Sequence, residues 1–315
     1  RLRLASAPAA SDVLSWHPPC KVVHDGALMY ARRERIRCYA RSTVTACMAL
    51  YFYELLIYDF IFLYRIIPSV RSASLGAIAV LCGVPTNTLW VLAVWSFLRC
   101  CFTDPGRISE EWRCFVSCTP GLITVDAKSQ WQPGQATTSK RSKDVRPERA
   151  HYCKVCQFDV LRMDHFCPWV GNAIGFRNFK FFILTLVYLD LCLFWAVLTV
   201  LLVVGVKLVD DGLHKAYSSF SNTEMGFLAS FLFVAVLALL LFTYTLYRHL
   251  PLAFRNLTSI ERKYSNMANP YDLGSSVVNL SQVMGAFGWD WFLPIVPRRP
   301  LSDGFSFRKS NEVLP

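Results

Sequence analysis

Charged residues are scarce in this sequence: they make up only 17% of its 315 residues, whereas hydrophobic residues make up 54%. Soluble domains usually carry about 25% charged residues, and disordered chains are poor in hydrophobic ones. The composition therefore excludes an intrinsically disordered chain and argues against an ordinary soluble domain. Residues 1–42 also lack the apolar core of a signal peptide, so no cleavable signal peptide is expected.

Four long apolar runs are present instead, and each has the length of about 20 residues that a membrane-spanning helix needs. The predicted spans are residues 43–64, 76–98, 179–206 and 226–250. Pro85 interrupts the second run, which a span tolerates when neighbouring helices satisfy the freed carbonyl groups. The expected fold class is therefore all-α integral membrane, with four transmembrane helices and a cytosolic, cysteine-rich loop domain between the second and third.

The distribution of Lys and Arg predicts the orientation of these spans. The two tails and the long middle segment together hold 27 of these residues, and the two short loops hold 4. Because cytosolic segments carry the excess of Lys and Arg, both termini and the middle segment are expected in the cytosol. The net charge of +11 then suits anionic headgroups or an anionic cofactor, and no nucleic acid partner is expected.

The compartment also decides how the twelve cysteines are interpreted. They are scattered, and cytosolic thiols are kept reduced, so the cysteines of the middle segment are expected to be free thiols or metal ligands. Three carboxylates fall within the predicted spans, at Glu54, Asp59 and Asp190. Such residues usually face the interior of a helix bundle, and for Asp190 a hydrogen-bonded structural role is favoured over a proton path.

The middle segment carries the chemistry. Cys153 and Cys156 form a C-x2-C pair, and Asp164, His165 and Cys167 follow. A thiol beside an imidazole, with a carboxylate to orient the ring, is a possible set of nucleophile, base and orienting group. The alternative is a metal-binding knuckle. Only eleven residues separate Cys167 from the third span, so its thiol is expected near the lipid interface.

The same stretch resembles the cysteine-rich domain of the DHHC family of protein S-acyltransferases. The matching motifs are RPER at 146–149, VLRMDH at 160–165, CPWV at 167–170 and the following GN-x-IG. Outside the loop, DPG follows the second span, TSIE at 258–261 matches the family's TTxE, and NPYDLG leads to Asn279. The structural motif residues carried over are Asp104, Pro105, Gly106, Thr258, Glu261 and Asn279.

This resemblance implies a division of the chain into seven parts. They are a cytosolic tail at 1–42, transmembrane helices 1 and 2 at 43–98, a cytosolic linker with the DPG motif at 99–145, the DHHC-like catalytic region at 146–178, transmembrane helices 3 and 4 at 179–250, a C-terminal region with the TTxE-like and NPYD motifs at 251–297, and a tail at 298–315.

The resemblance also implies a mechanism and its participants. Cys167 is expected to take a palmitoyl group from palmitoyl-CoA, with His165 as base and Asp164 as orienting group, and to pass it to cysteines of membrane-associated proteins. The partners implied are such protein substrates with membrane-proximal cysteines, acyl-CoA and the lipid bilayer. The residues expected to bind acyl-CoA are Trp169, Arg149, Arg162, Arg177 and Lys180. Cys192 and Tyr188 are expected to line the acyl cavity, and the small Cys192 suggests acceptance of chains longer than palmitate.

The signature departs from the family pattern at Phe166, so it reads DHFC. The family's first zinc site maps onto Ser139, Ser142, Tyr152 and Asp159, and none of these keeps the family ligand. The second maps onto Cys153, Cys156, Phe166 and Ala173, of which only the two cysteines remain. Structural zinc takes four ligands. Zinc is therefore an open question: His151, or Cys114 with Cys118, could complete a shifted site, or the two cysteines are buried remnants.

Two other functions compete with the enzyme. A catalytically degenerate membrane scaffold fits the lost zinc ligands, but Asp164, His165 and Cys167 are intact. A transporter or channel is disfavoured because no inverted repeat is visible. The expected location is a multi-pass protein of endomembranes, Golgi or endoplasmic reticulum, or of the plasma membrane.

Overall fold

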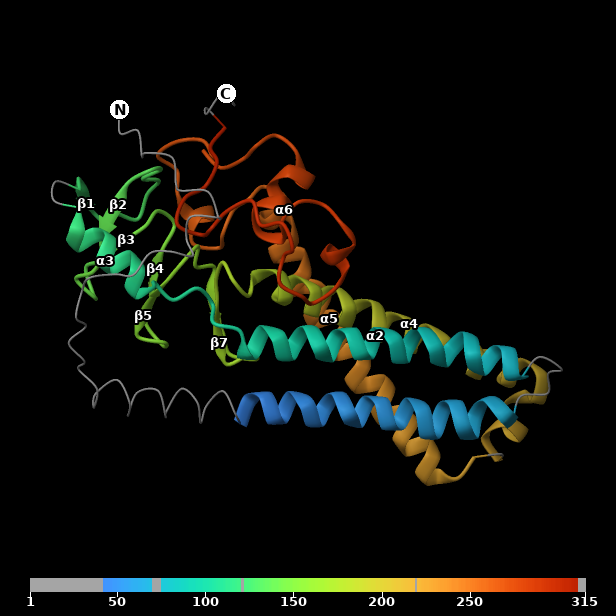
Figure 1. Cartoon of the computed structure of the whole chain (residues 1–315). Coiled ribbons are helices and arrows are strands. Elements are labelled where there is room, and N and C mark those ends of the chain that lie inside the picture. Colours follow the sequence, from blue (N-terminus) through green and yellow to red (C-terminus); the bar gives the residue numbers. More distant parts are fainter. Residues whose placement is uncertain (1–41, 70–74, 120–121, 219, 311–315) are drawn as a thin grey trace.

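The computed structural model describes residues 42–69, 75–119, 122–218 and 220–310. Its largest elements are four long helices that lie side by side, with the other elements gathered near one end of them (Figure 1). The helices are long and apolar enough to cross a membrane, which confirms the predicted fold class. They are the first span at Ser42–Ile66, α2 at Leu75–Phe102, α4 at Phe179–Ser218 and α5 at Asn222–Phe254.

The helices deviate from regular α-structure where the sequence requires it. The first span continues as a π-helix, η2 at Ile57–Ile66, and as a 3-10 turn, η3 at Ile67–Ser69. Pro85 lies inside α2, as the interrupted second run predicts. In α4, Gly212 takes a φ of 74°, which only glycine adopts freely, and it breaks the helix past the membrane-spanning part. α2 packs mainly on α4, and α4 also packs on α5.

The segment between α2 and α4 forms three small sheets and one short helix, α3 at Glu110–Cys118. The strands are β1 at Thr124–Asp126, β2 at Ala136–Thr138, β3 at Val145–Arg146, β4 at His151–Cys153, β5 at Phe158–Val160, β6 at His165–Cys167 and β7 at Asn172–Ile174. β1 is parallel to β2, whereas the pairs β2–β3, β4–β5 and β6–β7 are antiparallel.

The region 99–145, expected to be a linker, is therefore largely folded, because it contains α3, β1 and β2. Strands of two or three residues are too short to show an alternating pattern in the sequence. The domain boundaries themselves stay a prediction.

The C-terminal region folds back over the same end of the helices as the small sheets (Figure 1). It consists of η4 at Glu261–Lys263, α6 at Ser276–Met284 and η5 at Trp289–Phe292. The Asn279 amide donates to the carbonyl of Phe254, the last residue of α5, at 2.8 Å. This satisfies one of the carbonyl groups that every helix leaves unpaired at its C-terminus. The hydroxyl of Tyr188, on α4, donates to the Phe292 carbonyl and ties the other end of the region to the bundle.

A buried ion pair joins the C-terminal region to the small sheets. The Arg149 guanidinium donates to both carboxylate oxygens of Glu261, at 2.7 and 2.8 Å, and the two side chains are 1% and 2% exposed. Arg149 also donates to Asn256 and lies over the Tyr271 ring at 4.2 Å. A buried charge is tolerated only when it is paired and fully hydrogen-bonded, and this arrangement meets both conditions.

Removal of one partner of this pair is expected to destabilise the protein strongly. In Glu261→Gln, Arg149 keeps its charge in a buried site without a counter-ion, which costs about 3–5 kcal/mol of folding free energy. The thermal unfolding midpoint of the purified protein in detergent measures this loss. Glu110→Gln is the matched control, because Glu110 pairs with Arg113 at the surface and both side chains are about half exposed. Equal midpoints for the two variants would contradict the assignment.

Candidate active site

The residues predicted to carry the chemistry lie on and beside the β6–β7 hairpin. Successive side chains of a strand point to opposite faces, so His165 and Cys167 share one face and Phe166 takes the other. The two side chains are accordingly close enough for Cys167 to help raise the pKa of the His165 ring. Spacing by two residues in a strand therefore creates the contact that the sequence pattern suggested.

Two asparagines fix this hairpin to the membrane helices. The Asn172 amide donates to the carbonyls of Cys101 and Thr103, at 3.2 and 3.0 Å, at the C-terminal end of α2. The Asn178 amide donates to the Ala173 carbonyl in β7, at 2.8 Å, just before α4 begins. The hairpin thereby satisfies carbonyls at the end of α2 and holds Cys167 beside the ends of the helices.

Asp164 is the centre of the hydrogen-bond network. Its side chain is 1% exposed, and its Oδ2 lies 2.6 Å from His165 Nδ1. Ser259, in the TSIE motif, donates to the same carboxylate through its backbone N–H at 2.8 Å and its hydroxyl at 3.0 Å. A buried carboxylate with several donors is held in one orientation, so the His165 ring that it contacts is held as well.

These contacts shift the proton affinities of both groups. Burial by itself would raise the pKa of Asp164, but the interactions with His165 and His249 outweigh it and hold that pKa well below its ordinary value. Burial would lower the pKa of His165, but its bonds to Asp164 and Cys167 prevail and raise it to about 9. The imidazole is then protonated at neutral pH, and an imidazolium stabilises a neighbouring thiolate.

The sequence analysis missed His249, which lies near the cytosolic end of α5. Its Nδ1 is 3.3 Å from Asp164 Oδ2, and its ring is 4.8 Å from the His165 ring. Phe182 meets both imidazoles edge-on. The available signal was an ionisable residue inside the predicted span 226–250, but only carboxylates were considered there. Donor atoms of Asp164, His165 and His249 lie within 4.8 Å of one another, and their mutual contacts account for that proximity without an ion.

The thiol itself faces an apolar cluster. Cys167 is 6% exposed and belongs to the hydrophobic core that includes Val170, Phe182 and Tyr51. The Cys47 thiol, on the first span, approaches the Trp169 carbonyl at 3.7 Å. Side chains of the first span, the hairpin and α4 therefore meet around the sulfur atom.

Three of the five residues predicted to bind acyl-CoA are buried. Arg149 forms the ion pair with Glu261, Arg162 is 0% exposed, and Lys180 is 2% exposed with its ammonium group donating to the Asp290 carbonyl at 2.6 Å. In this structure these three cations do not reach the surface. Only Trp169, which is 58% exposed, and the exposed Arg177 keep an accessible position.

The DPG and TSIE motifs support the hairpin from two sides. Asp104 accepts hydrogen bonds from the backbone of Gly106 and Arg107, which closes the turn after α2. Gly106 has a φ of 106°, a conformation open mainly to glycine. In TSIE, the Thr258 N–H donates to Glu261 at 3.0 Å, so the segment that presents Ser259 to Asp164 is itself fixed.

Of the two residues predicted for an acyl cavity, only Cys192 lines one. A cavity of about 50 Å³ lies between the first span, α2, α4 and α5, and the Cys192 thiol there donates to the Thr86 carbonyl. Tyr188 is not among the residues that line this cavity, because its side chain points instead to the C-terminal region.

The residues present do not fit the first family zinc site. Ser142 donates to Asp159 at 2.5 Å, and the guanidinium of Arg146 lies 3.3 Å from the same carboxylate. Asp159 is 4% exposed. An arginine cation thus neutralises a carboxylate at the position where the family would hold a metal dication.

The second zinc site is replaced by apolar packing. Cys153 and Cys156 form a buried cluster with Val160, Met163 and Ala173, and Phe166 packs against it. The Cys156 backbone N–H donates to the Cys153 sulfur at 3.3 Å, and the contact with Cys156 lowers the pKa of Cys153. Among the residues that the structure describes, the one cluster of possible metal ligands is that of Asp164. Two thiols alone fall short of four ligands.

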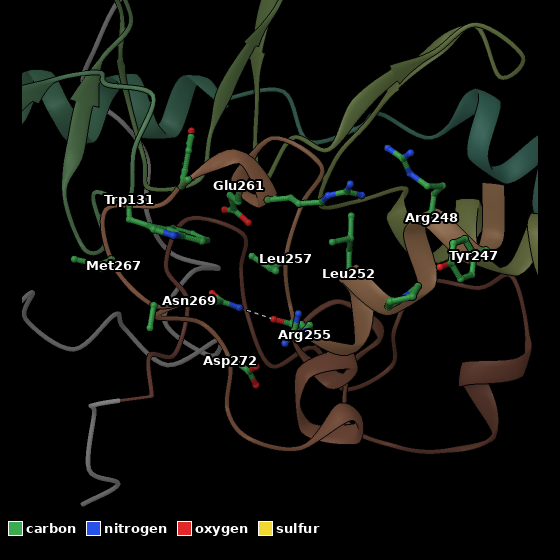
Figure 2. Close-up of a pocket in the computed structure, with 14 residues that line it drawn as sticks. Trp131, Tyr247, Arg248, Leu252, Arg255, Leu257, Glu261, Met267, Asn269 and Asp272 are labelled. Atoms are coloured by element: carbon green, nitrogen blue, oxygen red, sulfur yellow. Dashed lines mark hydrogen bonds between the residues drawn. The ribbon is translucent and has the colours of Figure 1, made fainter. Parts of the chain in front are cut away.

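A much larger pocket, of about 870 Å³, lies away from this network, between the end of α5 and the C-terminal region. Figure 2 shows Tyr247 and Arg248 on one side of it and Trp131 and Met267 on the other. Asp164, His165 and Cys167 are not among its lining residues, and its charges are mixed. Size alone therefore does not identify the reacting site in this protein.

Comparison with known proteins agrees with the geometry. A family model described as DHHC palmitoyltransferase matches residues 133–266. Probable protein S-acyltransferase 12 of Arabidopsis thaliana is 31% identical over 251 residues, which cover 77% of this chain and 84% of that protein. Palmitoyltransferase ZDHHC20-B of Danio rerio is 30% identical over 247 residues, 69% of this chain and 72% of that protein. Human palmitoyltransferase ZDHHC2 is 30% identical over 255 residues, 72% of this chain and 66% of that protein.

Replacement of the shared carboxylate is expected to release the histidine proton. In Asp164→Asn the imidazolium loses its buried anionic partner, so the pKa of His165 is expected to fall from about 9 toward its ordinary value of about 6.5. Titration of ¹⁵N-histidine signals by NMR follows the change. Asp144→Asn serves as the control, because that carboxylate lies at the surface beside Arg113. A wild-type His165 that already titrates near 6.5 would refute the proposed network.

Proposed function

The chain belongs to the DHHC palmitoyltransferase family, whose members are protein S-acyltransferases, and from this premise we propose that Cys167 carries the acyl group during transfer. The donor is long-chain acyl-CoA, principally palmitoyl-CoA, and the acceptors are cysteines of membrane-associated proteins. One observation supports this most directly: Asp164, His165 and Cys167 form a connected network at the cytosolic end of the membrane helices. The intact network favours an enzyme over a degenerate scaffold.

The first step forms an acyl-enzyme. The Cys167 thiolate attacks the thioester carbonyl of acyl-CoA, and a new carbon–sulfur bond forms as the bond to the CoA sulfur breaks. The proton held on His165 passes to the departing CoA thiolate, so the step neither gains nor loses protons. Asp164 keeps the ring aligned and compensates its charge while it carries the proton.

The second step transfers the group to the protein substrate. The substrate thiol gives its proton to His165, and its thiolate attacks the acyl-Cys167 carbonyl. The bond between the acyl carbon and the Cys167 sulfur breaks, which restores the thiolate–imidazolium pair. Each step exchanges one thioester for another, so the two sides are close in free energy.

The acyl chain is proposed to lie among the spans while its thioester is held at Cys167. Burial of a palmitoyl chain is worth about 0.8 kcal/mol per methylene, or about 11 kcal/mol in all. A chain kept in water during transfer would lose this stabilisation. The apolar surroundings of Cys167 and the cavity at Cys192 support the proposal. Because that cavity is smaller than an acyl chain, its walls must separate when the chain enters.

The remaining assignments follow from exposure and charge. Trp169 and Arg177 are accessible near the hairpin and are proposed to contact the CoA moiety. The excess of Lys and Arg outside the short loops supports cytosolic termini in an endomembrane or the plasma membrane. Substrate proteins then need a cysteine close to the bilayer surface, since Cys167 cannot leave it.

We also propose that the cysteine-rich region folds without structural zinc. The Arg146–Asp159 pair and the apolar cluster around Cys153 stabilise the places where the family has its metal ligands. Catalysis does not suffer by this change, because no step above uses a metal.

Acylation at Cys167 is tested with purified protein and labelled palmitoyl-CoA. The wild type is expected to take up hydroxylamine-sensitive label, and Cys167→Ser is expected to take up none, because an ester of serine resists hydroxylamine and a hydroxyl is a weak nucleophile. Cys118→Ser is the matched control, since Cys118 is an exposed thiol on α3 far along the chain from the hairpin. Equal labelling of Cys167→Ser and the wild type would reject Cys167 as the acceptor.

Metal content is tested on the same preparation. Zinc measured by mass spectrometry after gel filtration is expected to stay well below one ion per chain, and a chelator is expected to leave both the thermal midpoint and the labelling rate unchanged. Stoichiometric zinc, together with a chelator-induced fall in the midpoint, would contradict a metal-free fold.

A further inference from the structure

The cavity at Cys192 contains a carboxyl group for which the described part of the chain offers no partner. Glu54, on the first span, lines this cavity and is 9% exposed. Neither of its carboxyl oxygens has a hydrogen-bond partner among the described residues, and each is fully covered. Buried polar side chains in folded proteins almost always have partners, so an unpaired one requires an explanation.

Three polar side chains on the wall of this cavity already have hydrogen-bond partners. The Tyr58 hydroxyl bonds Thr199 at 2.8 Å, and the Thr86 hydroxyl donates to the Cys82 carbonyl at 2.8 Å. The Trp90 indole donates to the Tyr51 carbonyl at 3.0 Å. The Glu54 carboxyl, in contrast, is a group on the cavity wall that a bound molecule can satisfy.

An apolar chain would bury this carboxyl without a partner. A polar group transferred to an apolar environment without a hydrogen bond loses several kcal/mol on hydrocarbon scales, and intramembrane carboxylates usually mark functional sites. A simple saturated chain is therefore not the best ligand for a cavity with this wall. A chain that carries one hydroxyl group would satisfy Glu54 and still fill the apolar remainder.

The position of Glu54 decides where that hydroxyl must be. Cys47 lies beside the hairpin, at the Trp169 carbonyl, and Glu54 is seven residues farther along the same helix. At about 1.5 Å per residue, Glu54 lies about 10 Å deeper in the membrane than Cys47. Cys192, the residue predicted to line the acyl cavity, lines the same cavity as Glu54. The carboxyl thus faces the middle of a chain attached to Cys167, and neither its thioester nor its first carbons.

Resting on the proposed acyl transfer, we propose that Glu54 selects long-chain acyl groups with a hydroxyl near the middle of the chain. The Glu54 carboxyl and the acyl hydroxyl form a hydrogen bond inside the cavity. The transfer itself is unchanged: Cys167 gains the acyl carbon, and CoA leaves as a thiol.

The test is a competition between equal amounts of palmitoyl-CoA and a mid-chain hydroxypalmitoyl-CoA on the purified full-length protein. Intact mass spectrometry separates the two Cys167 adducts by one oxygen atom. The wild type is expected to favour the hydroxylated chain about tenfold, as a buried hydrogen bond to a previously unpaired group allows. The α-hydroxy and terminally hydroxylated isomers are expected to show no such advantage.

Two variants connect this preference to the carboxyl group. Glu54→Leu is expected to reverse the preference, because the hydroxyl then enters an apolar cavity without a partner, whereas Glu54→Gln is expected to keep it. Asp190→Leu is the matched control, since Asp190 lies on α4 in a separate groove formed with α5. An unchanged adduct ratio in Glu54→Leu, or a wild type that prefers palmitoyl-CoA, would overturn the proposal.

A binding measurement separates this proposal from the proposed reaction. In Cys167→Ser, thermal stabilisation by mid-chain hydroxypalmitoyl-CoA is expected to exceed that by palmitoyl-CoA, and the difference is expected to vanish when Glu54→Leu is added. If no adduct forms on the wild type but this difference is present, acyl transfer fails and the hydroxyl site stands. If adducts form without any Glu54-dependent difference, the reaction stands and the hydroxyl site fails.

Discussion

The architecture depends on one buried carboxylate. Asp164 is withdrawn from water, so its negative charge has to be compensated within the protein. The groups around it come from three separate places: His165 in the hairpin, Ser259 after the last span, and His249 at the end of that span, whose Nδ1 lies 3.3 Å away. Because these groups all contact Asp164, the positions of strand β6, the TSIE segment and helix α5 are fixed relative to one another. It also keeps His165 protonated beside the Cys167 thiol, which is the chemical state that the proposed transfer needs.

In the cysteine-rich region, too, distant segments are held together by paired charges and by burial. Where the family coordinates zinc, this chain has an arginine–carboxylate pair at one position and apolar packing at the other. A metal and an ion pair both connect segments that would otherwise be loosely held, and a hydrophobic cluster does so through burial. The buried Arg149–Glu261 pair adds a third connection, to the C-terminal region. On the proposal of a zinc-free fold, two ion pairs and a hydrophobic cluster together stabilise the region that four zinc ligands stabilise elsewhere in the family.

The position of Cys167 suits the two parts of its proposed acyl-CoA substrate, one of which needs water and the other an apolar environment. The hairpin is bonded to the end of α2 and lies just before α4, so the sulfur is at one end of the helix bundle. A charged CoA group stays in water, while an acyl chain gains free energy among the helices. Glu54 introduces a polar point on the otherwise apolar path of such a chain. On this proposal the enzyme selects acyl chains by the presence of a hydroxyl group as well as by their length.

The sequence by itself determined the four spans and the order of the motifs, because hydrophobic length and short motif spacing are local properties of the chain. It also predicted Asp164, His165 and Cys167 as the reacting set, because the motif places a carboxylate, an imidazole and a thiol close together in the chain. Only the tertiary structure revealed His249 beside Asp164, the burial of Arg149, Arg162 and Lys180, and the unpaired carboxyl of Glu54. Burial and pairing depend on which distant segments meet. The sequence does not show whether a basic residue faces solvent or a buried carboxylate. The tertiary packing decides which of these two environments it has.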